Sequence, residues 1–127
     1  GHLAYLERTD WMSRLNVILK YGPRRPFDPV DREAQLRNPR PLPELLDEFR
    51  DLRAENLQKL RAMQLSASDF EKTGTHPTLG PVTLRNLLAT WTAHDMAHLV
   101  QIGRTMARRY QDETGPFASF LSVMHKP

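Results

Sequence analysis

The sequence predicts an all-α protein organised as a helical bundle, and two observations favour this class. Apolar residues recur at three- and four-residue spacing in three long stretches, which is the pattern of helices that bury one face. The ten prolines of the 127-residue chain cluster between these stretches. Because 127 residues fit one domain, residues 1–127 are expected to form a single helical-bundle domain.

The first helical stretch runs from near the N-terminus to Tyr21 and stops at Gly22-Pro23, a strong helix terminator. Its apolar face is formed by Leu3, Leu6, Trp11, Leu15, Ile18 and Leu19. The segment that follows holds Pro23, Pro26, Pro29, Pro39, Pro41 and Pro43. Since prolines interrupt helices and extend the residue before them, we expect a long extended crossover here.

The second helix is expected to begin near Pro43, because proline suits the first helical turn. Glu44, Asp47 and Glu48 follow at once, with the charge that the positive end of a helix dipole prefers. The helix should end by about Leu65. Its predicted apolar stripe, interrupted by Asn56, consists of Leu45, Phe49, Leu52, Leu60 and Met63.

Residues 66–82 are expected to be irregular, because Gly74, His76-Pro77 and Gly80-Pro81 break regular structure. Thr83 can then cap a long helix that runs from Leu84 to about Tyr110. Gly115-Pro116 ends this region, and a short turn or helix should follow.

Three helices leave a groove where a fourth would lie, since each bundle helix must cover its apolar face with a neighbour. We therefore expect an up-down four-helix bundle with a long crossover loop. The N-terminal helix of that bundle is expected to be missing from this chain or to come from another subunit, so a homodimer is one expected assembly.

Composition narrows the partners and the compartment. The chain has no cysteine, which excludes disulfides, thiolate metal sites and a cysteine nucleophile. No apolar run approaches the ~20 residues that span a bilayer. Arg8 and Asp10 interrupt the early apolar run, which argues against a signal peptide. A cytoplasmic protein with no membrane partner is expected.

The net charge of +3 and the pI near 9.6 raise the question of nucleic acid. Arginine pairs occur at Arg24-Arg25 and Arg108-Arg109, but acidic residues follow both pairs within a few positions. A phosphate-binding surface needs a continuous basic stripe, preferably with aromatic residues for stacking. Solvated loops and helix ends are the preferred interpretation, and no nucleic-acid partner is expected.

The most informative segment runs from Trp91 to Leu99 and contains His94 and His98. Histidines four residues apart share one face of a helix, so both rings can reach one metal ion at ~2.0–2.1 Å. The same side is expected to carry Leu84, Leu87, Leu88, Trp91 and Ile102. Two buried histidines bonded to polar groups or water are the alternative, and this spacing alone leaves both open.

A third ligand would decide between these interpretations, and the remaining histidines are His2, His76 and His125. His2 opens the first helix, where Leu3 and Leu6 follow it, although Gly1-His2 is also what a cleaved affinity tag can leave. His76 precedes a proline in a loop and is expected to be exposed or packed in a turn. His125 lies near the end of the sequence and is expected to be exposed.

Two segments, Gly1–Trp11 and His76–Leu84 continuing through Trp91 to Leu99, resemble the DinB-like superfamily of metal-binding helical bundles. In that family one ligand is a histidine in a Gly-His-Leu context on the second bundle helix, followed by an acidic residue. The other two come from an HxxxH motif in the last long helix. The resemblance implies His2, His94 and His98 as metal ligands, and one more helix before His2.

Three neutral ligands leave an open coordination position, which is typical of a catalytic metal. All-imidazole ligation suits a divalent transition metal such as zinc, nickel or iron, or copper. The metal can lower the pKa of a bound water to ~7. A thiol bound to the metal is deprotonated outright. The resemblance implies a metal-dependent enzyme of the S-transferase or isomerase type whose small-molecule substrate is a low-molecular-weight thiol.

Two other functions stay open at this point: a metal-dependent hydrolase, and a non-catalytic metal-binding or structural bundle that dimerises. Arg14 and Gln101 are candidates for orienting a substrate, although Gln101 also fits an ordinary polar position. Glu7 and Asp95 are candidates for accepting a hydrogen bond from a ligand's second ring nitrogen. Asp95 lies ~100° around the helix from His94, which favours another helix or solvent as its surroundings.

Overall fold

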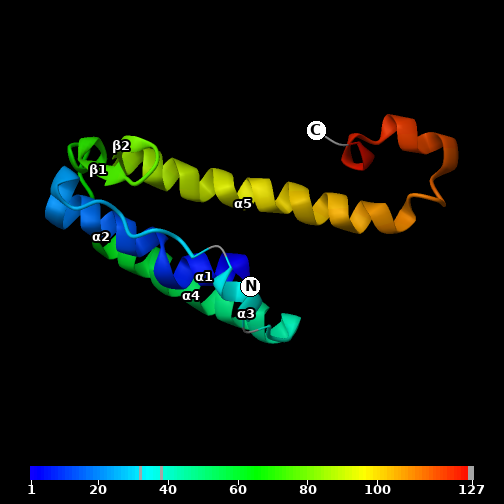
Figure 1. Cartoon of the computed structure of the whole chain (residues 1–127), viewed down its shortest axis with the longest axis horizontal. Coiled ribbons are helices and arrows are strands. Elements are labelled where there is room, and N and C mark those ends of the chain that lie inside the picture. Colours follow the sequence, from blue (N-terminus) through cyan, green and yellow to red (C-terminus); the bar gives the residue numbers. More distant parts are fainter. Residues whose placement is uncertain (32, 38, 126–127) are drawn as a thin grey trace. The chain divides into compact units, whose positions relative to one another are not determined.

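The computed structural model describes residues 1–31, 33–37 and 39–125 (Figure 1). The chain divides into two compact units, Gly1–Leu88 and Ala89–Pro127, and each is described by itself below. The predicted all-α class is confirmed, with one small hairpin added. The single domain over residues 1–127, the four-helix arrangement and the missing helix stay predictions.

The N-terminal unit begins with two helices where one was predicted: α1 (His2–Thr9) and α2 (Trp11–Tyr21). The chain bends at Asp10, whose φ is −111° and ψ −67°. The backbone N–H of Asp10 still reaches Leu6 at 3.0 Å, and that of Arg14 reaches the Asp10 carbonyl at 2.9 Å. Aspartate favours such interruptions because its side chain competes for polar partners near the backbone. The predicted end of α2 is confirmed, with Gly22 in left-handed conformation at φ +60°.

The crossover is extended, as predicted, apart from two short helical turns, η1 (Gly22–Arg24) and α3 (Ala34–Arg37). Pro26 forms a parallel bridge with Thr75, and the N–H of Phe27 donates to the Thr75 carbonyl at 2.9 Å. Phe27 is consequently buried, with 3 % of its surface exposed. The crossover is thereby anchored to a segment almost fifty residues later in the sequence.

Helix α4 (Leu42–Ala62) begins and ends close to the predicted positions, and Pro41 precedes it. It packs along α1, as Figure 1 shows. The predicted apolar stripe was only partly right, since Leu45, Phe49 and Leu52 are half-buried while the interrupting Asn56 is the buried residue of the helix. The polar partners of Asn56, described below, explain its burial.

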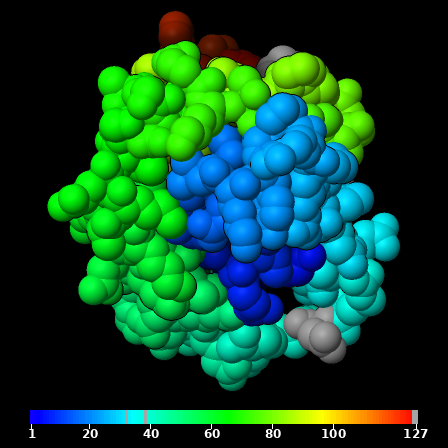
Figure 2. Space-filling model, turned by 90° about the vertical axis from the view of Figure 1, so that its left-hand side faces the viewer, coloured from blue at the N-terminus to red at the C-terminus, as the bar shows by residue number. Residues whose placement is uncertain are grey.

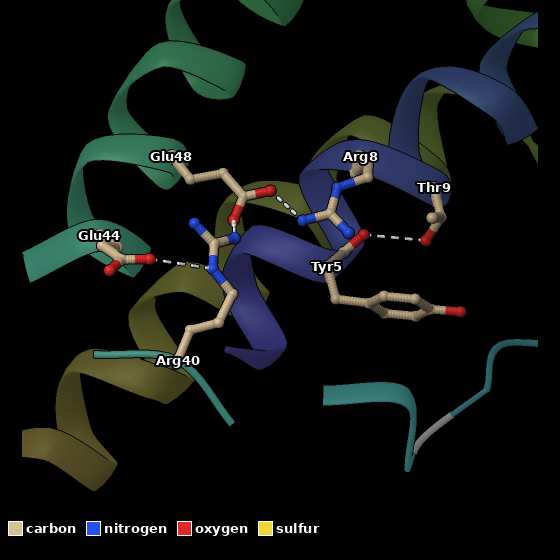
Figure 3. A network of polar contacts seen from close by, with 6 residues as sticks. All are labelled: Tyr5, Arg8, Thr9, Arg40, Glu44 and Glu48. Atoms are coloured by element: carbon tan, nitrogen blue, oxygen red, sulfur yellow. Dashed lines mark hydrogen bonds and ion pairs between the residues drawn. The ribbon is translucent and has the colours of Figure 1, made fainter. Parts of the chain in front are cut away.

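A network of charged side chains joins α1, the crossover and α4 (Figure 3). The carboxylate of Glu48 accepts from both Arg8 and Arg40, and Arg40 also lies 3.4 Å from a carboxylate oxygen of Glu44. On α1 itself the Thr9 hydroxyl donates to the Tyr5 carbonyl at 2.9 Å. Since Arg8 and Arg40 are largely exposed, these pairs contribute little to stability.

The prediction that residues 66–82 are irregular was wrong. After the short turn η2 (Asp69–Glu71), β1 (Thr73–His76) and β2 (Gly80–Thr83) form an antiparallel hairpin in which Thr73 pairs with Thr83. The glycines and prolines that suggested an irregular loop lie within this hairpin, and Gly80 adopts φ +77° at its turn. Thr73 and Thr83 form a β-branched pair, and the bridge between Thr75 and Pro26 adds a contact from the crossover.

Helix α5 (Leu84–Ala107) starts at the predicted cap, in the N-terminal unit, and continues into the C-terminal one. The Thr83 hydroxyl accepts from the Asn86 N–H at 3.1 Å, while the Asn86 side chain accepts from the Thr83 N–H at 2.9 Å. This reciprocal pair satisfies backbone donors at the helix start. Three 3-10 segments follow: η3 (Arg108–Tyr110), η4 (Gly115–Phe120) and η5 (Ser122–Met124).

The core of the N-terminal unit is formed by apolar side chains of α1, α2, the crossover and the start of α5, namely Ala4, Leu6, Trp11, Leu15, Val17, Ile18, Phe27, Leu84 and Leu87. Figure 2 shows one end of this unit, with the segment around the end of α2 (blue) filling the middle of the face. Green segments from α4 onward border it on one side, and the cyan crossover on the other.

The C-terminal part of α5 exposes its apolar residues. Met96, Leu99 and Ile102 expose 53 %, 59 % and 48 % of their surfaces, so the expectation of Ile102 on a buried face was wrong. Helical spacing reports which residues share a face, but burial requires a neighbour that covers it. Within the described residues, every helix is too short or too polar to cross a bilayer.

Candidate metal centre

The two histidines of α5 face one another. The Nε2 atoms of His94 and His98 lie 3.2 Å apart, the ring centroids are separated by 4.4 Å, and the ring planes are inclined at 65°. Their spacing of four residues brings both rings to one side of the helix, one turn apart. The predicted convergence of this pair is confirmed.

The spacing of the pair fits the ligand shell of one metal ion. Two nitrogens that each bind an ion at ~2.0–2.1 Å, at tetrahedral or octahedral angles, lie about 2.9–3.4 Å from each other. The observed 3.2 Å between the Nε2 atoms falls in that range. It is also the length of an N–H···N hydrogen bond, which requires one ring to carry its proton on Nε2.

The surroundings of the pair are less apolar than predicted. Both rings are half-buried rather than enclosed in a core. One or two turns earlier on the same helix Trp91 and Leu87 are buried, whereas Leu99 and Val100, which follow His98, are exposed. The rings therefore lie where the side chains along α5 change from buried to exposed.

His2 is the first residue of α1 and is half-buried, with the buried Leu6 one turn later. It belongs to the N-terminal unit, and His94 and His98 belong to the C-terminal unit. The structure thus brings His94 and His98 together, and the inclusion of His2 in the same site stays a prediction.

The family model of the DinB superfamily matches residues 1–102, which include His2, His94 and His98. The chain belongs to the DinB superfamily. The resemblance seen in the sequence is confirmed. Among curated proteins, none matches the sequence.

In this DinB superfamily chain, the acidic residue that follows His2 on α1 is held between two helices. Glu7 is buried, and its side chain exposes 1 % of its surface. One carboxylate oxygen accepts from Arg53 at 2.8 Å, and the other from the Asn56 side chain at 3.0 Å. Asn56 also donates to the Glu7 carbonyl at 2.8 Å. This contact fastens α1 to α4, a role that sequence analysis missed although Asn56 marked the position by interrupting the apolar stripe.

The other residues singled out in the sequence lie in varied surroundings. Arg14 pairs with the buried Asp10, its Nε 2.6 Å from a carboxylate oxygen. Asp95 is half-buried and Gln101 is exposed on α5. His125 is exposed, as predicted, and its ring lies 3.2 Å from the Ser119 carbonyl. A substrate-orienting role for Arg14 or Gln101 stays a prediction.

Proposed function

We propose that this DinB superfamily protein binds one divalent transition metal through His2, His94 and His98. The observation that supports this most directly is the 3.2 Å separation of the His94 and His98 Nε2 atoms, which suits two neighbouring ligands. All three histidines are half-buried and offer a ring nitrogen, and all three lie within the family match.

Three imidazoles are neutral donors, so they suit zinc, nickel or iron, and they leave a coordination position for a small molecule. An ion held there supplies Lewis acidity, which lowers the pKa of a bound thiol or water. We infer a metal-dependent enzyme that activates a small thiol for transfer to an electrophile, or water for hydrolysis. The half-buried rings hold this position at the edge of solvent, where a small substrate can reach it.

A second candidate is a metal-binding bundle without turnover that dimerises. The exposed apolar side chains of α5 favour it, because Met96, Leu99 and Met106 expose 53 %, 59 % and 66 % of their surfaces. Contiguous exposed apolar surface on a helix often marks an interaction site.

Metal analysis of purified protein tests the proposed ligands. Protein incubated with zinc, nickel or iron and then desalted should retain about one ion per chain, in keeping with a three-histidine site. The His94→Ala/His98→Ala double variant should lose this ion, and His2→Ala should weaken its retention. His125→Ala is the matched control, because His125 is exposed and directly follows the 3-10 segment η5. Equal metal content in the wild type and the double variant would refute the site.

A thiol-transfer assay separates the enzyme from the binding protein. Small thiols are offered with an electrophile such as monochlorobimane, with and without a chelator. The enzyme hypothesis predicts transfer that the chelator abolishes and that added zinc or nickel restores. Rates indifferent to the chelator, in protein that does retain metal, would favour the non-catalytic candidate.

A further inference from the structure

A second group of titratable side chains lies in the N-terminal unit and includes none of the three histidines proposed as metal ligands. It draws on four segments: Asp10 between α1 and α2, Arg14 on α2, Phe27 in the crossover and His76 at the end of β1. The Arg14 guanidinium lies 5.2 Å from the centre of the Phe27 ring, and the His76 ring meets the edge of Phe27 at 6.2 Å between centroids. The buried Phe27 ring therefore contacts both the Arg14 guanidinium and the His76 ring.

His76 holds the β1–β2 turn through a single ring nitrogen. Its Nδ1 lies 3.2 Å from the backbone N–H groups of both Thr78 and Leu79, and 3.2 Å from the Thr78 hydroxyl. Backbone N–H groups only donate, so Nδ1 acts as an acceptor and the neutral ring carries its proton on Nε2. A proton on Nδ1 would abolish both backbone bonds at once.

The charges around His76 oppose its protonation. Burial lowers the pKa of His76, the Arg14 guanidinium lowers it further, and the Asp10 carboxylate raises it. Asp10 is less effective as a counterion because it is already paired with Arg14 at 2.6 Å. Burial raises the pKa of Asp10 itself, against the effect of Arg14.

We propose that His76 is a pH-sensitive latch, which in its neutral form closes the β1–β2 turn and on protonation in mild acid releases the amides of Thr78 and Leu79. This inference is independent of the metal site. The turn closes the hairpin whose Thr75 carbonyl, next to His76, accepts from Phe27 and anchors the crossover. The latch thus closes the hairpin to which the crossover is anchored.

The lowered pKa of His76 determines how the stability of the fold changes with pH. Because the folded chain holds a lowered His76 pKa, it takes up the proton less readily than the unfolded chain, whose pKa is ~6.5. The stabilisation is complete above pH 6.5 and is lost as the pH falls through the folded pKa. Asp10 acts in the opposite direction, because its raised pKa makes its ionised form costly at neutral pH and that cost disappears only in stronger acid.

The matched variant is His76→Asn. An asparagine oxygen also accepts from backbone N–H groups two residues on in turns, but it does not titrate. Hydrogen-exchange protection of the Thr78 and Leu79 amides, corrected for intrinsic exchange, is measured at pH 7.5 and at one pH unit below the midpoint of the His76 titration. Wild type should lose protection about five- to tenfold at the lower pH, the equivalent of about one ordinary hydrogen bond. His76→Asn should keep its protection, and an equal loss in both proteins would overturn the proposal.

Nitrogen NMR of the wild-type His76 ring gives a second measurement that needs no variant. The latch predicts the Nε2–H tautomer at pH 7.5 and a titration midpoint below 6.5. An Nδ1–H tautomer, or a midpoint at or above 6.5, would overturn the proposal even if His76→Asn does not fold.

Discussion

The Nε2 atoms of His94 and His98 lie 3.2 Å apart on successive turns of α5. Both rings lie on one side of the helix, whereas the exposed Met96 and Val100 follow His94 and His98 by two residues and lie on other parts of the helix surface. The helix thus carries both a candidate ligand site and an uncovered apolar face.

Metal should stabilise the folded protein through this pair. A ligand at about 100 times its Kd adds about 2.7 kcal/mol to the free energy of unfolding. For a chain of this size such a gain raises Tm by roughly 10 °C. Thermal unfolding with and without zinc or nickel should show this rise for wild type and for His125→Ala, and none for His94→Ala/His98→Ala. A rise of equal size in the double variant would show that the ion binds elsewhere.

Loss of the Glu7 carboxylate should destabilise the α1–α4 contact. The side chain is buried, and Arg53 and Asn56 bind its two oxygens. Glu7→Ala leaves those donors without their acceptor, which costs about 3 kcal/mol in buried pairs. Urea unfolding measures the loss. The control is Glu55→Ala, which removes only an exposed pair with Lys59 and should change stability by about 0.5 kcal/mol or less. Similar values for the two variants would contradict the clamp.

The two glycines Gly74 and Gly103 should respond oppositely to alanine. A Cβ on Gly74 would come within 2.7 Å of Ile18 Cγ1 and 2.9 Å of the Phe27 ring, both in the core. Gly74→Ala should therefore cost about 1–3 kcal/mol by overpacking. A Cβ added to Gly103 on α5 would meet no atom of the described residues within 4 Å beyond the neighbouring backbone of its own helix, and alanine should raise stability by up to about 1 kcal/mol. Denaturant unfolding of the two variants measures both changes in stability. If Gly74→Ala did not change stability, the hairpin would not pack closely against α2.

The start of α5 should depend on the hydroxyl of Thr83, which accepts from the Asn86 N–H at 3.1 Å. Thr83→Ala should lower the free energy of unfolding by about 1 kcal/mol, the usual value of such a cap. Thr105→Ala is the matched control, because its hydroxyl donates to the Gln101 carbonyl at 2.8 Å and lies near the end of α5 instead of at its start. If both substitutions had the same effect, the cap would be of no consequence.

Local patterns in the sequence were sufficient to predict the helices, the end of α2 at Gly22 and the cap at Thr83. They also predicted that the rings of His94 and His98 meet. Each depends on residues within a few positions of one another, where spacing and backbone preference act directly. The family resemblance carried by the segments around His2 and His94 rests on the same local motifs. The bend at Asp10 was missed because its pairing with Arg14 competes with a helical pattern that continues on both sides.

Only the tertiary structure decided which segments cover each face of the helices and of the hairpin. The hairpin of residues 73–83 forms because distant segments use it, Phe27 bonding to Thr75 and Gly74 lying against Ile18. Asn56 is buried because Glu7, 49 residues earlier, binds it, and Ile102 exposes 48 % of its surface although helical spacing places it on the same side as the buried Trp91. Burial and long-range pairing depend on which segments meet in space, and a one-dimensional pattern records only which residues are able to meet.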